Sequence, residues 1–274
     1  MTNDSLAPDD QSPDSIHPWR TKWRRLRFEL TSALATQPWA YLAVLQIYLR
    51  VFRRDPIGSA VGKNTEIVIE GFPRCGNTFA VFAFCQAQTR LRNIAHHCHS
   101  SPQILAAARR KIPTLVLVRD PHGAATSYLV RCPYLTAAQV LKQYVRYHQQ
   151  IRFYSNSFVV ATFDEITTDF GAVVRRVNKK FGTDFDQFEH NEENVAECFR
   201  RLDEFNKTES KAPAVRAARI NRPSAAKEAL KLEAARKIDA PELAHLLNEA
   251  LQIFEEFRSW SGATGGETFY RQSE

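Results

Sequence analysis

The clearest chemical pattern in the sequence is a turn bounded by glycines, residues 71–78, with the sequence GFPRCGNT. The turn follows a short apolar run at 66–70 and precedes a segment at 79–88 that is typical of a helix. The first N–H groups of a helix have no partner within it, and the helix dipole adds partial positive charge at that end. A strand, a turn and a helix in this order therefore predict an anion site, of which phosphate is the usual ligand.

The spacing of Gly71, Gly76 and Thr78 matches the phosphate-loop pattern G-x-x-x-x-G-K-[ST], but Asn77 stands where that pattern has lysine. In phosphoryl-transfer enzymes the lysine neutralises the β- and γ-phosphates beside Mg²⁺, so its absence argues against ordinary ATP or GTP hydrolysis. Arg74 lies within the turn and offers a fixed fork of donors to an oxyanion. The alternative is a plain strand-to-helix turn with an exposed arginine.

A second candidate site follows the apolar run at 114–118. This run ends in Arg119 and Asp120, and Ser127 lies eight residues beyond Arg119 on the next expected helix. Ligands of open α/β sheets bind beyond the carboxyl ends of the strands, so Arg119 and Ser127 should lie at the same edge as the turn. The alternative is a helix-capping aspartate beside a structural salt bridge.

Three of the eight histidines lie within four positions, His96, His97 and His99, in a run at 93–98 that we interpret as a strand. Alternate residues of a strand face the same side, so His97 and His99 should share a face opposite to that of His96. A histidine with a pKa near neutrality suits general base catalysis. Histidines satisfied in the core and a metal site are the alternatives, but no metal is expected because no carboxylate or further histidine lies nearby in the sequence.

Residues 71–79 resemble the 5'-phosphosulfate loop of sulfotransferases that use 3'-phosphoadenosine 5'-phosphosulfate (PAPS), where an aromatic-Pro-Lys/Arg-Ser-Gly-Thr/Asn-Thr run occupies this turn. The resemblance implies that Arg74 is the catalytic cation. Cys75 replaces the usual serine, and because a thiol is a weak donor, the backbone is the dependable contribution there. The cofactor-binding residues implied by the loop are Pro73, Arg74, Cys75, Gly76, Asn77, Thr78 and Phe79.

The other two patterns are similar to the same family. Arg119 and Ser127 resemble its 3'-phosphate site, in which an arginine at a strand end and a serine eight positions later hold the ribose phosphate. Residues 97–102 resemble its Lys-Thr-His-Leu-Pro segment, which places His99 on the general base and His97 on the lysine, although the proline comes one position late.

Members of the family also close the nucleotide site with a late basic segment. The loop at 215–224 is the candidate here, with Arg219 and Arg222 as cofactor-binding residues, although a solvated helical turn would explain the same pattern.

The order of predicted strands and helices from Thr65 onwards indicates the fold that must position these residues. Four short apolar runs alternate with helical segments, which indicates an α/β fold with a parallel sheet. We expect a three-layer fold like that of the P-loop NTPases, with a central parallel sheet of at least four strands and additional N-terminal helices. The four runs are 66–70, 93–98, 114–118 and 158–163.

Three regions follow along the chain: a disordered tail at 1–17, a basic amphipathic helical segment at 18–62, and a sulfotransferase-like P-loop domain at 63–274. In the second region Trp19, Trp23, Leu26, Leu30 and Leu34 form one apolar stripe among five basic residues. We favour a helix whose stripe packs on the domain and whose basic face is solvated. The alternative is peripheral contact of residues 19–35 with an anionic membrane.

Composition limits the class of protein. Of the 274 residues, 44% are hydrophobic and 24% charged, and the net charge of +7 suits an anionic ligand without requiring nucleic acid, which is not expected as a partner. Five widely spaced cysteines suggest reduced thiols in a cytoplasmic protein. The acidic start of the chain does not fit a secretory signal, and the longest apolar stretch, residues 38–52, is shorter than the roughly 20 residues that span a bilayer.

The resemblance to this family implies an enzyme that transfers a sulfonate group from PAPS to a hydroxyl or amine, with no metal required. The expected acceptor is a small molecule, a carbohydrate or a lipid. The alternatives are a P-loop nucleotide kinase or NTPase, and a non-catalytic protein that binds membrane surfaces.

Overall fold

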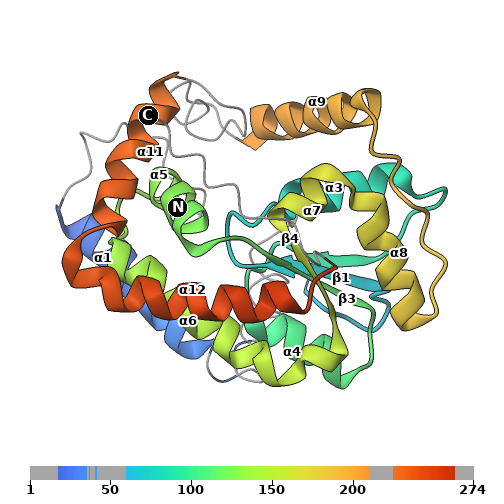
Figure 1. Ribbon diagram of the computed structural model, residues 1–274, viewed down its shortest axis with the longest axis horizontal. Coiled ribbons are helices and arrows are strands. Elements are labelled where there is room, and N and C mark those ends of the chain that lie inside the picture. Colours follow the sequence, from blue (N-terminus) through green and yellow to red (C-terminus); the bar gives the residue numbers. More distant parts are fainter. Residues whose placement is uncertain (1–17, 36, 38–40, 42–59, 210–224, 263–274) are drawn as a thin grey trace, which may run out of the picture.

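The computed structural model describes residues 18–35, 37, 41, 60–209 and 225–262. Its centre is a sheet of four parallel strands in the order β2-β1-β3-β4 (Figure 1). The strands are β1 (Ile67–Gly71), β2 (Ile94–His96), β3 (Thr114–Val118) and β4 (Val159–Thr162). The expected α/β fold with a central parallel sheet is confirmed. Every residue of β1, β3 and β4 is buried, as the nearly continuous apolar runs of a sheet covered on both faces require.

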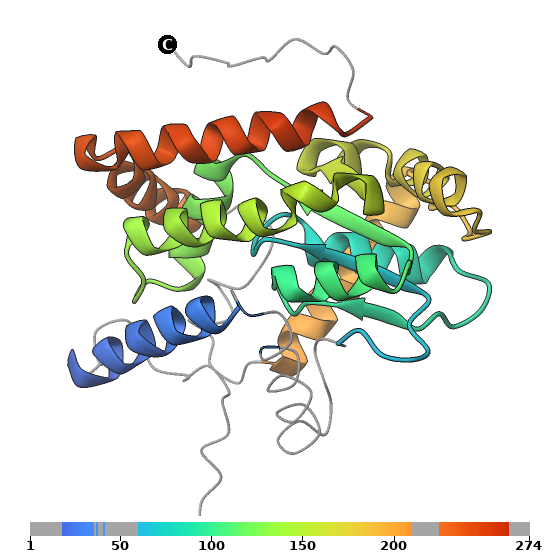
Figure 2. The same cartoon turned by 90° about the horizontal axis from the view of Figure 1, so that it is seen from below.

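Helices cover both faces of this sheet and complete three layers (Figures 1 and 2). On one face Phe188 contacts both Phe79 of α3 (Asn77–Ala87) and Phe170 of α8 (Phe170–Phe181). The other face carries α4 (Ser101–Arg109), α6 (Ala137–Ile151) and α12 (Ala244–Ser259). The remaining described helices are α1 (Pro18–Leu34), α5 (Pro121–Arg131), α7 (Phe163–Thr168), α9 (Glu192–Glu209), α11 (Ala225–Ile238) and the 3-10 helices η2 (Arg152–Ser157) and η3 (Pro241–Leu243).

The strand order places a switch point at the carboxyl ends of β1 and β3. The chain leaves β1 towards β2 at one edge and leaves β3 towards β4 at the other, and ligands of open α/β sheets bind where the direction changes. Gly71 pairs with Leu117, so the turn at 72–78 and Arg119 begin at nearly the same level of the sheet.

Short polar signals begin the helices around this edge. The Asp120 carboxylate accepts a hydrogen bond from the N–H of Gly123 at the start of α5, over 2.6 Å. Thr136 and Gln139 form a capping box at the start of α6, and Thr162 and Glu165 form another at α7. These caps satisfy N–H groups that a helix cannot pair internally, and they fix where each helix leaves the sheet.

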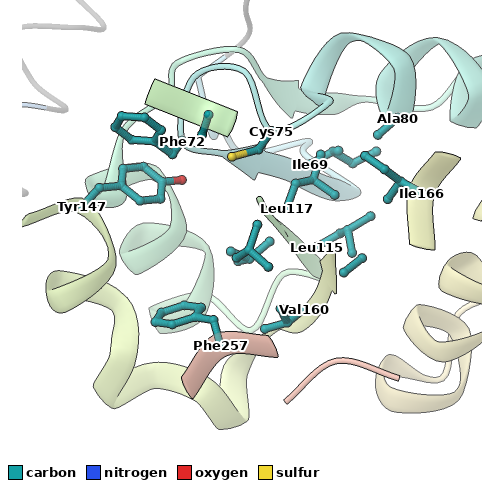
Figure 3. Packing of buried hydrophobic residues seen from close by; sticks show 14 of the residues in the cluster. Ile69, Phe72, Cys75, Ala80, Leu115, Leu117, Tyr147, Val160, Ile166 and Phe257 are labelled. Carbon is teal, nitrogen blue, oxygen red and sulfur yellow. The ribbon is translucent and has the colours of Figure 1, made fainter. Parts of the chain in front are cut away.

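The turn at 71–78 is anchored in the core by Phe72. Its ring is fully buried and makes edge contacts with Tyr128, Tyr144 and Tyr147 from α5 and α6, at centroid distances of 5.8, 5.1 and 6.0 Å. Figure 3 shows Phe72 and Tyr147 within the packed cluster that surrounds the strand residues. The turn therefore rests on an aromatic support from two other helices.

Helix α1 is docked in the orientation opposite to the one we favoured. Trp19 and Trp23 are 63% and 60% exposed, whereas Phe28 packs against the core cluster and Ser32 is buried. The expectation that the apolar stripe packs on the domain is therefore wrong. None of the described helices is long and apolar enough to cross a membrane. The proposed tail at 1–17 and most of residues 36–59 lie outside the described residues.

Candidate active site

Two glycines allow the turn its tight path. A Cβ on Gly71 would lie 2.5 Å from the carbonyl oxygen of Leu117, and a Cβ on Gly76 would lie 2.4 Å from Cδ1 of Ile166. Gly76 also has a φ of 87°, in the left-handed region that glycine adopts without penalty. Only glycine fits either position, so the turn lies close against the neighbouring strand and α7.

Helix α3 begins directly after this turn. Its first backbone bond of the α-helical type runs from the N–H of Ala80 to the carbonyl of Gly76. The N–H groups of residues 77–79 precede it, so they have no acceptor within the helix, and Gly76 at the N-cap has no side chain to cap them. These amides and the helix dipole form an end of the kind that binds anions.

The structure brings Arg74, Arg119 and Ser127 together from three different elements. Arg74 Nε donates to Ser127 Oγ over 2.9 Å, and Arg119 Nη1 donates to the carbonyl oxygen of Arg74 over 3.2 Å. The Arg119 guanidinium also lies 4.2 Å from the ring centroid of Phe163, and the Tyr144 hydroxyl donates to the Arg119 carbonyl over 2.8 Å. The two phosphate sites expected from the sequence are therefore contiguous.

This group of residues has an excess of positive charge. Burial, followed by the charges of Arg131 and Arg119, lowers the pKa of Arg74 to about 10. Arg131 was missed in the sequence, although it lies four positions after Ser127 on α5 and thus on the same helix face. Like charges gathered beside a helix N-terminus favour a ligand with more than one negative group.

Asn77 closes the turn from within. Its side chain is buried, and Nδ2 donates to the carbonyl oxygen of Phe72 over 3.0 Å. Its Oδ1 makes no hydrogen bond to the described part of the chain. The position that carries lysine in a phosphoryl-transfer loop is here an asparagine that holds the turn closed through this hydrogen bond, which we call the clasp.

Other residues of the predicted loop point their side chains into the core. Pro73 is buried, and Cys75 is fully buried beside Phe72 and Ile69, as Figure 3 shows, where burial raises the pKa of its thiol to about 12. Phe79 packs on the ring of Phe188. These residues can offer an anion only their backbone, and the Cys75 side chain takes no part.

The histidines do not follow the predicted strand. Strand β2 ends at His96, and His97 and His99 have φ angles of 57° and 47°, in the left-handed region. His97 and His99 therefore do not share a strand face, and that prediction is wrong. They nevertheless lie beside the turn, because His97 Nε2 is 3.1 Å from Thr78 Oγ1 and His99 Nδ1 is 3.0 Å from the carbonyl oxygen of Gly71.

The protonation of His99 follows from this contact. A carbonyl oxygen only accepts, so Nδ1 carries the proton and Nε2 holds the lone pair. Burial, together with the charge of Arg74, lowers the pKa of His99, although the bond to Gly71 acts in the opposite direction. His97 is affected more strongly, since burial and the two neighbouring histidines lower its pKa to about 2. Both imidazoles are therefore neutral at pH 7.

Glu70 is a second site residue, besides Arg131, that sequence reasoning missed. Its buried carboxyl group accepts from the N–H of Cys98 over 2.7 Å, the N–H of His99 over 3.0 Å and Nε2 of Gln103 over 2.8 Å. Burial raises the pKa of Glu70 to about 8, although these donors favour the ionised form. The signal was a carboxylate in an otherwise apolar strand, one position before the turn. Glu70 thus fixes the backbone of the His99 loop relative to the turn.

Arg219 and Arg222 lie outside the described residues. Within the part of the chain that is described, no group of three or more His, Cys, Asp or Glu side chains could hold a metal ion.

Comparison with known proteins adds little to this geometry. No protein-family model matches the sequence, and no curated protein sequence matches it. Among solved structures, mouse sulfotransferase SULT7A1 complexed with PAP is similar at 12% sequence identity and a TM-score of 0.38, over 69% of this chain and 90% of that one. A likeness at that level carries no argument about activity, so the function must be argued from the residues themselves.

Proposed function

We propose that this chain is a sulfotransferase that moves a sulfonate group from PAPS to a hydroxyl or amine of an acceptor. The observation that supports this most is the chain of contacts from Ser127 through Arg74 to Arg119. It joins the turn expected at the 5'-phosphosulfate to the pair expected at the 3'-phosphate. A nucleotide with anionic groups at both ends would engage the whole chain of contacts.

The described residues suit such a ligand in charge. Two arginines, Arg131 and Arg119, lie close enough to lower the pKa of Arg74, and a bound polyanion would relieve this repulsion. The amides at the start of α3 and the Arg74 guanidinium would hold the 5' group, while Arg119 and Ser127 would hold the 3'-phosphate. When bound, PAPS supplies the sulfonate group and a phosphate as the leaving group.

The chain's own residues would supply charge stabilisation and a base. Arg74 would stabilise the negative charge that develops on the leaving phosphate oxygen, a role that requires no metal ion. His99 would take the proton of the acceptor on Nε2, because its Nδ1 donates to Gly71. Glu70 would position His99 through its backbone N–H.

A nucleotide kinase or NTPase is the alternative that shares this fold. Asn77 argues against a kinase or NTPase. Its buried side-chain amide donates a hydrogen bond to the carbonyl oxygen of Phe72 and supplies no cation at the position where such enzymes carry lysine. Calorimetric titration separates the two functions. We expect adenosine 3',5'-bisphosphate to bind without metal and more tightly than ATP with Mg²⁺. Tight binding of ATP with Mg²⁺ alone would refute the sulfotransferase proposal.

A further inference from the structure

Helix α1 turns an apolar face away from the rest of the described chain. Trp19, Trp23, Leu26 and Leu30 form this face, and we call them the outer stripe. Their exposed fractions are 63%, 60%, 49% and 59%. They recur at intervals of four, three and four, so they lie along one side of the helix. Four large apolar side chains exposed in one row need a partner, unlike single exposed apolar residues.

The opposite side of α1 is attached to the domain and fixes the direction of the outer stripe. Arg25 Nε donates to the carbonyl oxygen of Tyr134 over 2.5 Å, Phe28 packs against the core cluster, and Ser32 is buried. Arg25, Phe28 and Ser32 recur at intervals of three and four, about half a turn from the outer stripe. Figure 2 shows α1 at the edge of the molecule, away from the sheet. The helix could turn its stripe inwards only by breaking these contacts.

Cations border the outer stripe on both sides. Lys22 lies on one flank and Arg27 on the other, and both are exposed. The helix carries five basic residues and one acidic residue, Glu29, whose carboxylate accepts from Gln139 Nε2 over 2.9 Å. A second copy of the chain would bring cations against cations, so the charge disfavours self-association through this face.

An anionic bilayer surface matches both features. Tryptophan rings reside at the headgroup level of membranes, where their apolar body and N–H donor are both satisfied. Basic residues beside them are attracted to anionic headgroups. We propose that α1 lies on an anionic lipid bilayer with the outer stripe in the headgroup region, and so holds the domain at the membrane surface. This proposal does not depend on the proposed enzyme activity.

Co-sedimentation of the full chain with lipid vesicles tests the proposal. We expect binding to vesicles of phosphatidylcholine mixed with phosphatidylserine, much weaker binding to phosphatidylcholine alone, and a loss of binding as salt rises. Trp19→Ala with Trp23→Ala should lower the partition coefficient about tenfold or more, because two large apolar side chains no longer leave water. Lys22→Gln with Arg27→Gln should lower it about fivefold for each charge removed.

Matched controls come from exposed residues outside α1. Phe153 is 85% exposed, so Phe153→Ala removes an aromatic side chain as accessible as the tryptophans. Lys179 and Lys180 are exposed on α8, so Lys179→Gln with Lys180→Gln removes the same charge. Both control variants should bind vesicles as the parent protein does.

Four outcomes would overturn the proposal. The tryptophan variant could bind as the parent does, or binding could be equal on both vesicle types at all salt concentrations. Sedimentation velocity without lipid could reveal a dimer that the tryptophan variant loses, which would identify a second copy as the partner. A lower unfolding midpoint of the tryptophan variant would mean that another segment of the chain covers the outer stripe.

Discussion

Replacing Arg74 with methionine should make the ligand-free protein more stable while weakening its affinity for adenosine 3',5'-bisphosphate. The pKa of Arg74 falls from 12.5 to about 10, and each pKa unit corresponds to about 1.4 kcal/mol, so the folded state disfavours this charge by roughly 3 kcal/mol. Loss of the charged hydrogen bond to Ser127 offsets about 1.5 to 3 kcal/mol of this. The net gain should be roughly 1 kcal/mol.

The sign of this effect depends on pH in a defined way. Arg74 has a lower pKa in the folded than in the unfolded state, so the penalty is fully present below pH 10. It is relieved only as pH rises from about 10 to 12.5. Measurements at pH 7 therefore detect the whole effect. A gain of about 1 kcal/mol raises the midpoint of a domain of this size by about 2 to 4 °C.

Thermal unfolding with and without adenosine 3',5'-bisphosphate is the assay. A ligand at 100 times its Kd stabilises the parent protein by about 2.7 kcal/mol, and Arg74→Met should lose most of that increment. Arg109→Met is the control, because Arg109 is exposed in the last turn of α4 and its replacement should alter neither quantity in this direction. The reasoning is refuted if Arg74→Met lowers the midpoint without ligand, or if the ligand stabilises it as it does the parent.

Three further predictions follow from the same site. Arg119→Ala should weaken adenosine 3',5'-bisphosphate by about 1.5 to 3 kcal/mol more than adenosine 5'-phosphate, and calorimetry showing equal losses would remove the 3'-phosphate role. His99→Ala should abolish transfer with nucleotide affinity retained, and His97→Ala should reduce transfer less. Because burial lowers the pKa of His99, the acidic limb of the parent's rate profile should lie below pH 6.5, and a limb above 6.5 would contradict this assignment. Glu70 binds its proton more tightly in the folded than in the unfolded state. The free energy of unfolding of the parent should therefore fall, relative to that of Glu70→Gln, by about 1.4 kcal/mol per pH unit between pH 4.5 and about 8. If urea unfolding gives the two proteins the same dependence of stability on pH, Glu70 is not a buried carboxyl group that titrates in this range.

The sequence was sufficient to predict the sheet and the turn because their determinants are local. An apolar run such as 114–118 predicts a buried strand from its composition and length alone. Gly71 and Gly76 indicate a turn in which the backbone lies close to its neighbours. Convergence of Arg119 with that turn followed from a general property of parallel sheets, whose carboxyl ends share one edge.

The histidine loop could not be predicted in this way. Positive φ angles at His97 and His99 are maintained by a carboxylate on another strand, Glu70, which accepts from the N–H groups of Cys98 and His99. The secondary-structure preferences of residues 93–99 do not depend on that long-range contact, so the sequence predicts an extended strand there. The sequence also did not predict that the apolar stripe of α1 faces away from the domain, for a related reason. An amphipathic pattern identifies an apolar face but does not state what that face meets.

The clasp formed by Asn77 limits how this loop could change in evolution. A lysine introduced at this position would occupy a buried place, where desolvation disfavours its charge, and the carbonyl of Phe72 would lose its donor. The one substitution that would complete a phosphoryl-transfer motif therefore weakens the turn before it supplies a usable cation. Asn77→Lys alone is therefore not expected to give a Mg²⁺-dependent kinase, because a second change would be needed to reopen the turn.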